Sequence, residues 1–99
     1  MIPDMSKVPK LYSQEKAGIE NTIIYQKWIH PFAPGFYWLI SEYDPIEQMA
    51  FGYANLNDDQ NAEWGYIYLP EIIEAGACIE KSFESQKFTS IIHSLNNQI

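Results

Sequence analysis

Three neighbouring segments rich in aromatic and β-branched residues constrain the fold of this chain more than any other feature. They cover residues 36–43, 48–54 and 62–69, and only short turn-forming sequences separate them. Asp44 favours the first position of a turn, and Pro45 presets φ for the second. The second connection, residues 55–61, consists almost entirely of Asn, Asp and Gln. Short connections of this kind join antiparallel strands, so the sequence predicts a three-stranded antiparallel meander.

The order of large and small residues predicts how these strands pair. If Tyr43 pairs with Gln48, Trp38 faces Tyr53 and Ile40 faces Phe51. If Ala54 pairs with Glu63, the second hairpin has the pairs Tyr53–Trp64, Gly52–Gly65, Phe51–Tyr66 and Met49–Tyr68. A slip of one residue would move every side chain to the other face, so the agreement between the hairpins supports both registers.

These registers predict two faces. The first would carry Phe36, Trp38, Ile40, Met49, Phe51, Tyr53, Trp64, Tyr66 and Tyr68, and the second Tyr37, Leu39, Ser41, Ala50, Gly52, Gly65, Ile67 and Leu69. Neither face is plainly polar, so we expect both to be at least partly covered.

The flanking sequence predicts shorter elements. Residues 1–21 are polar and read as an extended arm anchored by Leu11 and Tyr12, followed by a strand over 22–29. Pro70 suits the first turn of a short helix over 70–75, and residues 77–83 could form a fifth strand. Phe88, Ile91, Ile92 and Leu95 follow helical spacing, so a C-terminal helix is expected to cover one face. The chain is therefore predicted to be one α+β domain over residues 1–99: an antiparallel meander of four to five strands with one or two short helices.

Composition limits the classes of partner. The chain has 13 acidic residues against 6 lysines and no arginine, a formal charge of −7. Nucleic-acid binding normally rests on a basic surface, so direct binding of nucleic acid is disfavoured.

The single cysteine, Cys78, is expected to be buried and inert, and it suits a reducing cytosol. The N-terminus lacks a signal-peptide pattern, and no apolar run is long enough for a membrane span.

Carboxylates form the first candidate site. Between Lys27 and Lys81 the chain has no cationic Lys or Arg, while it has nine acids: Glu42, Asp44, Glu47, Asp58, Asp59, Glu63, Glu71, Glu74 and Glu80. These acids could be a solvated surface that keeps a small protein in solution. They could also meet a basic partner, because opposite charge steers encounter. An enzymatic alternative is a carboxylate pair drawn from Glu42, Asp44 and Glu63, which general acid–base catalysis would require.

An aromatic stripe forms the second candidate site. Trp64, Tyr66 and Tyr68 alternate along one predicted strand, beside Trp38 and Tyr53. Such a stripe is usually part of a core. If it is exposed, it could stack on sugars or anchor a protein interface.

The remaining polar residues favour no metal site and no cofactor. Asn57, Asp58, Asp59 and Asn61 lack the spacing of a calcium-binding loop and are interpreted as a mobile loop. His30 precedes a proline in a loop, and His93 is expected in solvent on the C-terminal helix. Neither has a second ligand at metal-binding spacing.

Several short motifs resemble a bacterial family catalogued as domain of unknown function 2958. They are Pro9-Lys10-Leu11-Tyr12, Glu42-Tyr43-Asp44-Pro45, Phe51-Gly52, Glu63-Trp64-Gly65-Tyr66 and Leu69-Pro70-Glu71-Ile72, which together cover most of residues 9–85. Glu80-Lys81-Ser82-Phe83 departs from the acidic-basic-acidic run of the family, and residues 89–99 lie outside the resemblance. The resemblance implies an accessory or interaction role in bacteria and mobile elements, and it brings no reaction.

Together these observations predict a non-enzymatic acidic protein that binds a basic macromolecular partner, with a mobile-element inhibitor or decoy as one version. The predicted partner-binding residues are Glu42, Asp44, Glu63, Trp64, Tyr66, Glu71 and Glu74. We expect the acids to gather on one surface, bridged by the short helix. The alternatives are a small hydrolase that uses paired carboxylates and a sugar- or peptide-binding module that uses the aromatic stripe. The oligomeric state stays open.

Overall fold

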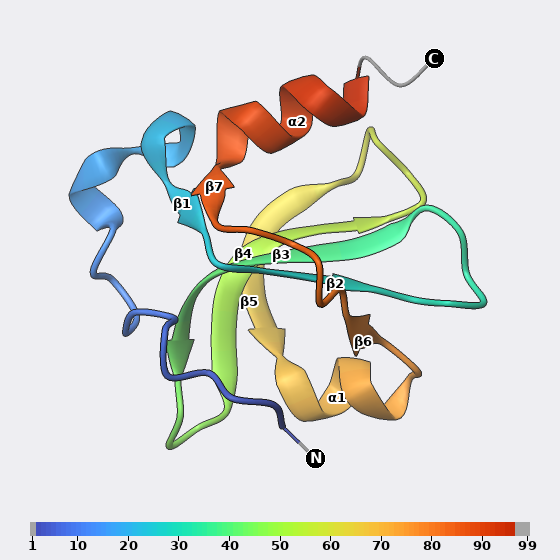
Figure 1. Cartoon of the computed structure of the whole chain (residues 1–99), viewed down its shortest axis with the longest axis horizontal. Coiled ribbons are helices and arrows are strands. Elements are labelled where there is room, and N and C mark those ends of the chain that lie inside the picture. The colour runs from blue at the N-terminus through green and yellow to red at the C-terminus, as the bar shows by residue number, and fades with distance from the viewer. Residues whose placement is uncertain (1, 97–99) are drawn as a thin grey trace.

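A computed structural model describes residues 2–96 and confirms the α+β class (Figure 1). Its main sheet has five antiparallel strands in the order β5-β4-β3-β2-β6, and β1 and β7 form a separate two-stranded sheet. The strands are β1 (Ile23–Ile24), β2 (Gln26–Ile29), β3 (Phe36–Asp44), β4 (Met49–Leu56), β5 (Glu63–Tyr68), β6 (Cys78–Ile79) and β7 (Gln86–Lys87). The helices are the 3₁₀ turns η1 (Glu15–Ala17) and η2 (Ile19–Asn21), and the α-helices α1 (Leu69–Glu74) and α2 (Phe88–Asn96). Among the described residues, no helix is long and apolar enough to cross a membrane.

The three-stranded meander and both α-helices are confirmed, whereas two flanking strands differ from prediction. The strand expected over 22–29 is divided between β1, which pairs with β7, and β2, which pairs with β3. The strand expected over 77–83 shrinks to β6, which lies beside β2 at the far edge of the sheet. Pro70 lies in the first turn of α1, as predicted, and Gly76, at φ +108°, redirects the chain after it. This reversal lets the chain pass from β5 to the opposite edge.

The predicted register of β4 with β5 is confirmed. Phe51 pairs with Tyr66, and Gly52 lies opposite Gly65. The rings of Phe51 and Tyr66 pack edge to face with centroids 5.5 Å apart. This hairpin follows the alternation that the sequence displays.

The predicted register of β3 with β4 is wrong. Trp38 pairs with Ala54 and Ile40 with Gly52, and a β-bulge at Ser41 shifts the register further toward the turn. Trp38 and Ile40 therefore lie over small residues of β4 rather than over its aromatic rings, whereas Leu39 pairs with Tyr53. Steric fit explains this choice: a Cβ on Gly52 would come within 1.9 Å of the carbonyl oxygen of Leu39, so the two strands approach only because glycine has no side chain.

The predicted assignment of β3 to the two faces is therefore wrong. The face that carries Trp38 and Ile40, called the first face from here on, forms a closed core. Its buried residues are Met5, Val8, Trp28, Trp38, Ile40, Tyr43, Ala50, Ile67, Leu69, Ile72 and Ala77. They come from the sheet, from α1 and the segment that follows it, and from the N-terminal arm. Trp38 and Ile40 thus share a face with Ala50 and Ile67, the residues from which they were predicted to be separated.

The second sheet face is less tightly covered. Ile24, Leu39 and Ile91 are buried there, and half-buried aromatic rings, among them those of Tyr53, Trp64 and Phe88, pack around them. Helix α2 covers this face, as predicted. Figure 1 shows α2 at one end of the sheet and α1 at the other.

The N-terminal arm was predicted to be extended, but it contains turns and the two 3₁₀ helices. Met5 and Val8 are buried in the first core, and the Val8 amide donates to the carbonyl of Met5 at 3.0 Å. The Tyr43 amide donates to the carbonyl of Pro9 at 2.8 Å. The turn brings the two apolar side chains to the same side, so the arm is secured by burial near its start as well as by the segment around Tyr12.

Candidate functional site

The β-bulge in β3 turns an acidic side chain toward the second sheet face. Ser41 is the extra residue, so Ser41 and Glu42 together oppose Phe51 of β4. With regular alternation Glu42 would share the closed face with Ile40, and the inserted residue reverses that direction. Glu42, Phe51 and Tyr66 therefore form one cross-strand row over β3, β4 and β5.

The Glu42 carboxylate holds the N-terminal arm. Its side chain is buried, with 5% of the residue exposed. One oxygen accepts the backbone N–H of Tyr12 at 2.8 Å, and the other accepts the backbone N–H of Gln14 at 2.9 Å. Among the described residues, no lysine or histidine nitrogen lies within 4.0 Å of this carboxylate.

The side chain of Gln14 completes the attachment of the arm. Its amide oxygen accepts the N–H of Ile23 at 2.7 Å, and its amide nitrogen donates to the carbonyls of Ile23 and Ser41, each at 3.0 Å. The Gln14 side-chain amide therefore pairs with the backbone of β1 at Ile23, as a neighbouring strand would. It also satisfies the carbonyl of the bulged residue, which a buried strand could not leave unpaired without cost.

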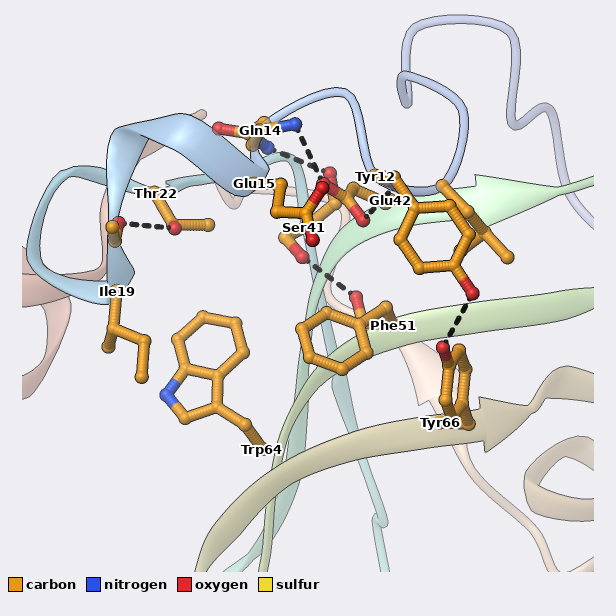
Figure 2. Close-up of a pocket in the computed structure, with 12 residues that line it drawn as sticks. Tyr12, Gln14, Glu15, Ile19, Thr22, Ser41, Glu42, Phe51, Trp64 and Tyr66 are labelled. Atoms are coloured by element: carbon orange, nitrogen blue, oxygen red, sulfur yellow. Dashed lines mark hydrogen bonds between the residues drawn. The ribbon is translucent and has the colours of Figure 1, made fainter.

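Tyr12 adopts a strained backbone at this attachment. Its φ of +71° lies in the left-handed region, which costs a bulky residue about 1–2 kcal/mol. The hydrogen bond to Glu42 stabilises this conformation and directs the ring toward β5. There the hydroxyls of Tyr12 and Tyr66 lie 2.7 Å apart (Figure 2). This hydrogen bond is the main cause that raises the pKa of Tyr66 above 10.0, followed by desolvation and nearby charges.

A pocket of about 290 Å³ lies between the arm and the aromatic rings. Figure 2 shows Phe51 and Trp64 on one side of it and Ile19, Thr22 and Glu15 on the other. Its lining consists of Leu11, Tyr12, Gln14, Glu15, Gly18, Ile19, Thr22, Ser41, Glu42, Phe51, Trp64 and Tyr66. This lining contains two carboxylates and no lysine or histidine.

Trp64 is the central ring of the pocket wall. It stacks on Phe51 with centroids 5.8 Å apart and packs edge to face against Phe88 of α2 at 4.8 Å. The indole is half-buried, and its N–H has no acceptor among the described residues. The ring is therefore fixed by its neighbours while one polar atom and part of its surface stay available.

The seven predicted partner-binding residues do not form one cluster. Glu42, Trp64 and Tyr66 line the pocket. Asp44 lies at the end of β3, where its carboxylate accepts the N–H of Ile46 at 3.0 Å, as expected of a turn residue. Glu63 points to the opposite face from Trp64 because strand side chains alternate.

The other two predicted residues, Glu71 and Glu74, are exposed on α1, which packs on the first core through Leu69 and Ile72. They therefore lie on an element that covers the face away from the pocket. The sequence prediction thus combined residues of one site with acids from elsewhere on the surface.

Other candidate residues have structural explanations. Cys78 is exposed, contrary to the prediction of a buried thiol, because β6 is a short edge strand. The ring of His30 makes a 2.8 Å hydrogen bond with the carbonyl of Ala75, and His93 is exposed as expected. Among the described residues, no three His, Cys, Asp or Glu side chains gather as a metal site would need.

The loop after β4 is organised by a buried side chain. Asn55 donates to the Asp59 carboxylate at 2.8 Å and accepts the N–H of Asp58 at 2.9 Å. These bonds use the loop acids to fix the turn. The mobility predicted for this loop is therefore not supported by its hydrogen bonding.

Sequence reasoning missed the contribution of the arm to the pocket. Tyr12 was identified only as an anchor, and Gln14 was not identified at all. A glutamate within an otherwise apolar strand was the available signal, because a buried carboxylate requires hydrogen-bond donors. The location of those donors, 28 and 30 residues earlier in the chain, had no local signature.

Comparisons with family models, with curated proteins and with solved structures gave no match. The resemblance to the bacterial family therefore stays a prediction, and the site is interpreted from its own chemistry.

Proposed function

We propose that this chain is a non-enzymatic interaction protein that binds a basic macromolecular partner at the pocket between the arm and the β4–β5 hairpin. One observation carries the proposal. Glu42 is buried in the pocket wall beside aromatic rings, and no cation of the described chain lies within salt-bridge distance of it. A buried carboxylate attracts a cation strongly when the surrounding dielectric is low.

The rest of the molecule favours the same class of partner. The formal charge is −7, and acids such as Glu63, Glu71 and Glu74 are exposed on other parts of the surface. Charge of this kind steers a basic partner and raises its rate of association. Trp and Tyr are the residue types that most often contribute binding energy at interfaces, and Tyr66 is 57% exposed at the rim of the pocket.

The geometry gives the hydrolase alternative less support. Glu42 and Glu63 project from opposite faces of the sheet. Both oxygens of Glu42 already accept backbone N–H groups, and Asp44 is engaged in its turn. A general acid and base need two carboxyls that flank one substrate, and these three residues do not provide that arrangement.

Calorimetry with a lysine-rich peptide tests the proposal. A peptide of the same length with glutamine in place of lysine is the matched control. We expect the lysine peptide alone to bind, with an affinity that falls steeply between low and physiological salt because screening shortens the field to about 8 Å. Trp64→Ala should weaken binding about tenfold or more, whereas Glu71→Gln, which removes a charge on α1, should change it less than threefold.

Two results would contradict the proposal. The first is a lysine peptide that binds no better than its glutamine control. The second is binding that Glu71→Gln and Trp64→Ala weaken equally, since this would indicate a diffuse attraction to acidic surface. A third result would support the aromatic-stripe alternative instead. In that case the glutamine peptide or an oligosaccharide binds, its affinity depends on Trp64, and salt does not change it.

A further inference from the structure

We propose that the pocket binds the terminal ammonium group of a lysine side chain. This inference rests on the proposed function and deepens it, because it names the group that a basic partner would insert. It follows from the size of the pocket, from the nature of its walls and from the hydrogen bonds that Glu42 already makes.

The size of the pocket suits one side chain. Its volume is about 290 Å³. Pockets for drug-sized ligands range upward from about 300 Å³, and a cavity of about 150 Å³ is enough for a benzene ring. One long aliphatic side chain with its charged end therefore fits, whereas an extended oligosaccharide or a folded loop does not.

The walls match an aliphatic stem that ends in a cation. Phe51, Trp64 and Ile19 offer apolar surface to the stem. Trp64 is the best of the aromatic side chains at holding a cation over its ring face. Glu15, from the arm, and Glu42, from β3, add two negative charges to the same lining, which has no competing lysine or histidine.

The hydrogen bonding of Glu42 favours ammonium over guanidinium. Arginine prefers a carboxylate that offers both oxygens to its planar fork. In Glu42, one oxygen is bound by the Tyr12 amide and the other by the Gln14 amide. Each oxygen therefore keeps one lone pair, and a bidentate guanidinium needs both of them free in one plane, whereas a compact ammonium needs only one.

The exposed acid Glu15 allows a test of charge without disturbing the arm. Its side chain makes no hydrogen bond among the described residues, unlike that of Glu42, so Glu15→Gln removes a pocket charge and leaves the attachment of the arm intact. Glu71→Gln removes an equal charge from α1 and is the matched control.

The experiment titrates the full chain with n-butylammonium and follows the indole N–H of Trp64 by NMR. The neutral 1-pentanol has a similar size and tests whether charge matters, and n-butylguanidinium tests the choice of cation. We expect saturable binding of n-butylammonium in the millimolar range, at least fivefold tighter than 1-pentanol and tighter than n-butylguanidinium. Trp64→Leu, which keeps an apolar side chain, should weaken it about 3- to 30-fold. Glu15→Gln should weaken it more than Glu71→Gln does.

Equal or tighter binding of 1-pentanol would overturn the inference, as would an unmoved indole signal at saturating n-butylammonium. Tighter binding of n-butylguanidinium would overturn the choice of lysine. A lysine-rich peptide that still binds through Trp64 in any of these cases would leave the proposed function standing. If n-butylammonium binds and the lysine peptide does not, the proposed function fails while the pocket chemistry holds.

Discussion

The two faces of the sheet are built from similar residues but are packed differently. On the first face, Trp38 and Ile40 lie over the small residues of β4, and α1 and the arm pack over them. On the second face, rings lie over rings: Tyr53 and Trp64 pack edge to face at 5.9 Å, and α2 covers only part of the row. Large side chains over small ones fill space, whereas rigid rings side by side leave a gap where their cover ends. The pocket occupies that gap.

The largest expected difference between the faces concerns their tryptophans. Trp28→Ala should cost about 3–5 kcal/mol of unfolding free energy, because Trp28 is 2% exposed in the closed core. Trp64→Ala should cost clearly less, since its ring is half-buried and borders a pocket that is already open. Urea unfolding of the two variants measures both losses. Equal losses would mean that the second face is as tightly packed as the first.

The paired glycines sharpen the comparison at the level of the backbone. Gly52→Ala should destabilise the fold by about 1–3 kcal/mol, because the new methyl would meet the Leu39 carbonyl. Gly65→Ala should change stability by less than about 0.5 kcal/mol, since nothing lies within 4 Å of a Cβ there. Thermal unfolding of both variants provides the test. A tolerated alanine at position 52 would disprove the close approach of β3 and β4.

The attachment of the arm predicts a local effect on the open face. In Glu42→Gln the side chain keeps one acceptor oxygen, and its amide nitrogen cannot accept the second backbone N–H. We expect a loss of about 1–2 kcal/mol and faster hydrogen exchange at the Tyr12 and Gln14 amides than in the wild-type protein. Glu71→Gln on α1 should leave both amides unchanged. Unaltered exchange in Glu42→Gln would show that the carboxylate does not hold the arm.

The smallest expected effect concerns the tyrosine pair at the rim. Because the hydroxyl of Tyr12 raises the pKa of Tyr66, Tyr12→Phe should lower that pKa toward 10.0. Absorbance of tyrosinate during an alkaline titration follows the change, with Tyr66→Phe identifying the signal. If the pKa of Tyr66 is unchanged in Tyr12→Phe, the two hydroxyls are not in contact in solution.

Two half-buried tyrosines contribute a pH dependence of stability with a defined direction. Burial raises the pKa of Tyr37 and of Tyr53, so the folded state holds these protons more tightly than the unfolded chain. Their contribution to stability is complete below pH 10.0 and is lost as the pH rises through the raised values. Denaturant midpoints measured across this range should therefore fall. Midpoints that rise with pH would contradict the assigned burial.

The sequence predicted those parts of the fold that local pattern controls. The β4–β5 register follows from alternation and from one pair of glycines, and Pro70 lies in the first turn of α1 as expected. The β3–β4 register could not be predicted for two reasons: the turn lies one residue later in the chain than predicted, with Asp44 opposite Met49, and the bulge at Ser41 adds a residue that no turn signal reports. Alternation without the bulge places Trp38 among the rings, and only three-dimensional packing reveals that it lies over Ala54.

The candidate site was predicted in part for the same reason. Trp64 and Tyr66 were recognised from their alternation, and Glu42 from its charge. The arm residues Tyr12 and Gln14 reach the site through hydrogen bonds between segments far apart in the chain. Glu71 and Glu74, which lie on α1, were included in the predicted site because of their charge alone. Composition carries no information about which face an acid occupies.

The central claim is that a basic partner binds at the pocket on the second face rather than on acidic surface in general. The most direct test uses a lysine-rich peptide with a nitroxide label at one end. Paramagnetic broadening of NMR signals then locates the bound peptide. The account predicts the strongest broadening at the Trp64 indole and at the Tyr12 and Gln14 amides, all of which border the pocket. Broadening strongest at the amides of Glu71 and Glu74 would contradict it, because the peptide would then lie on α1, which packs on the closed face.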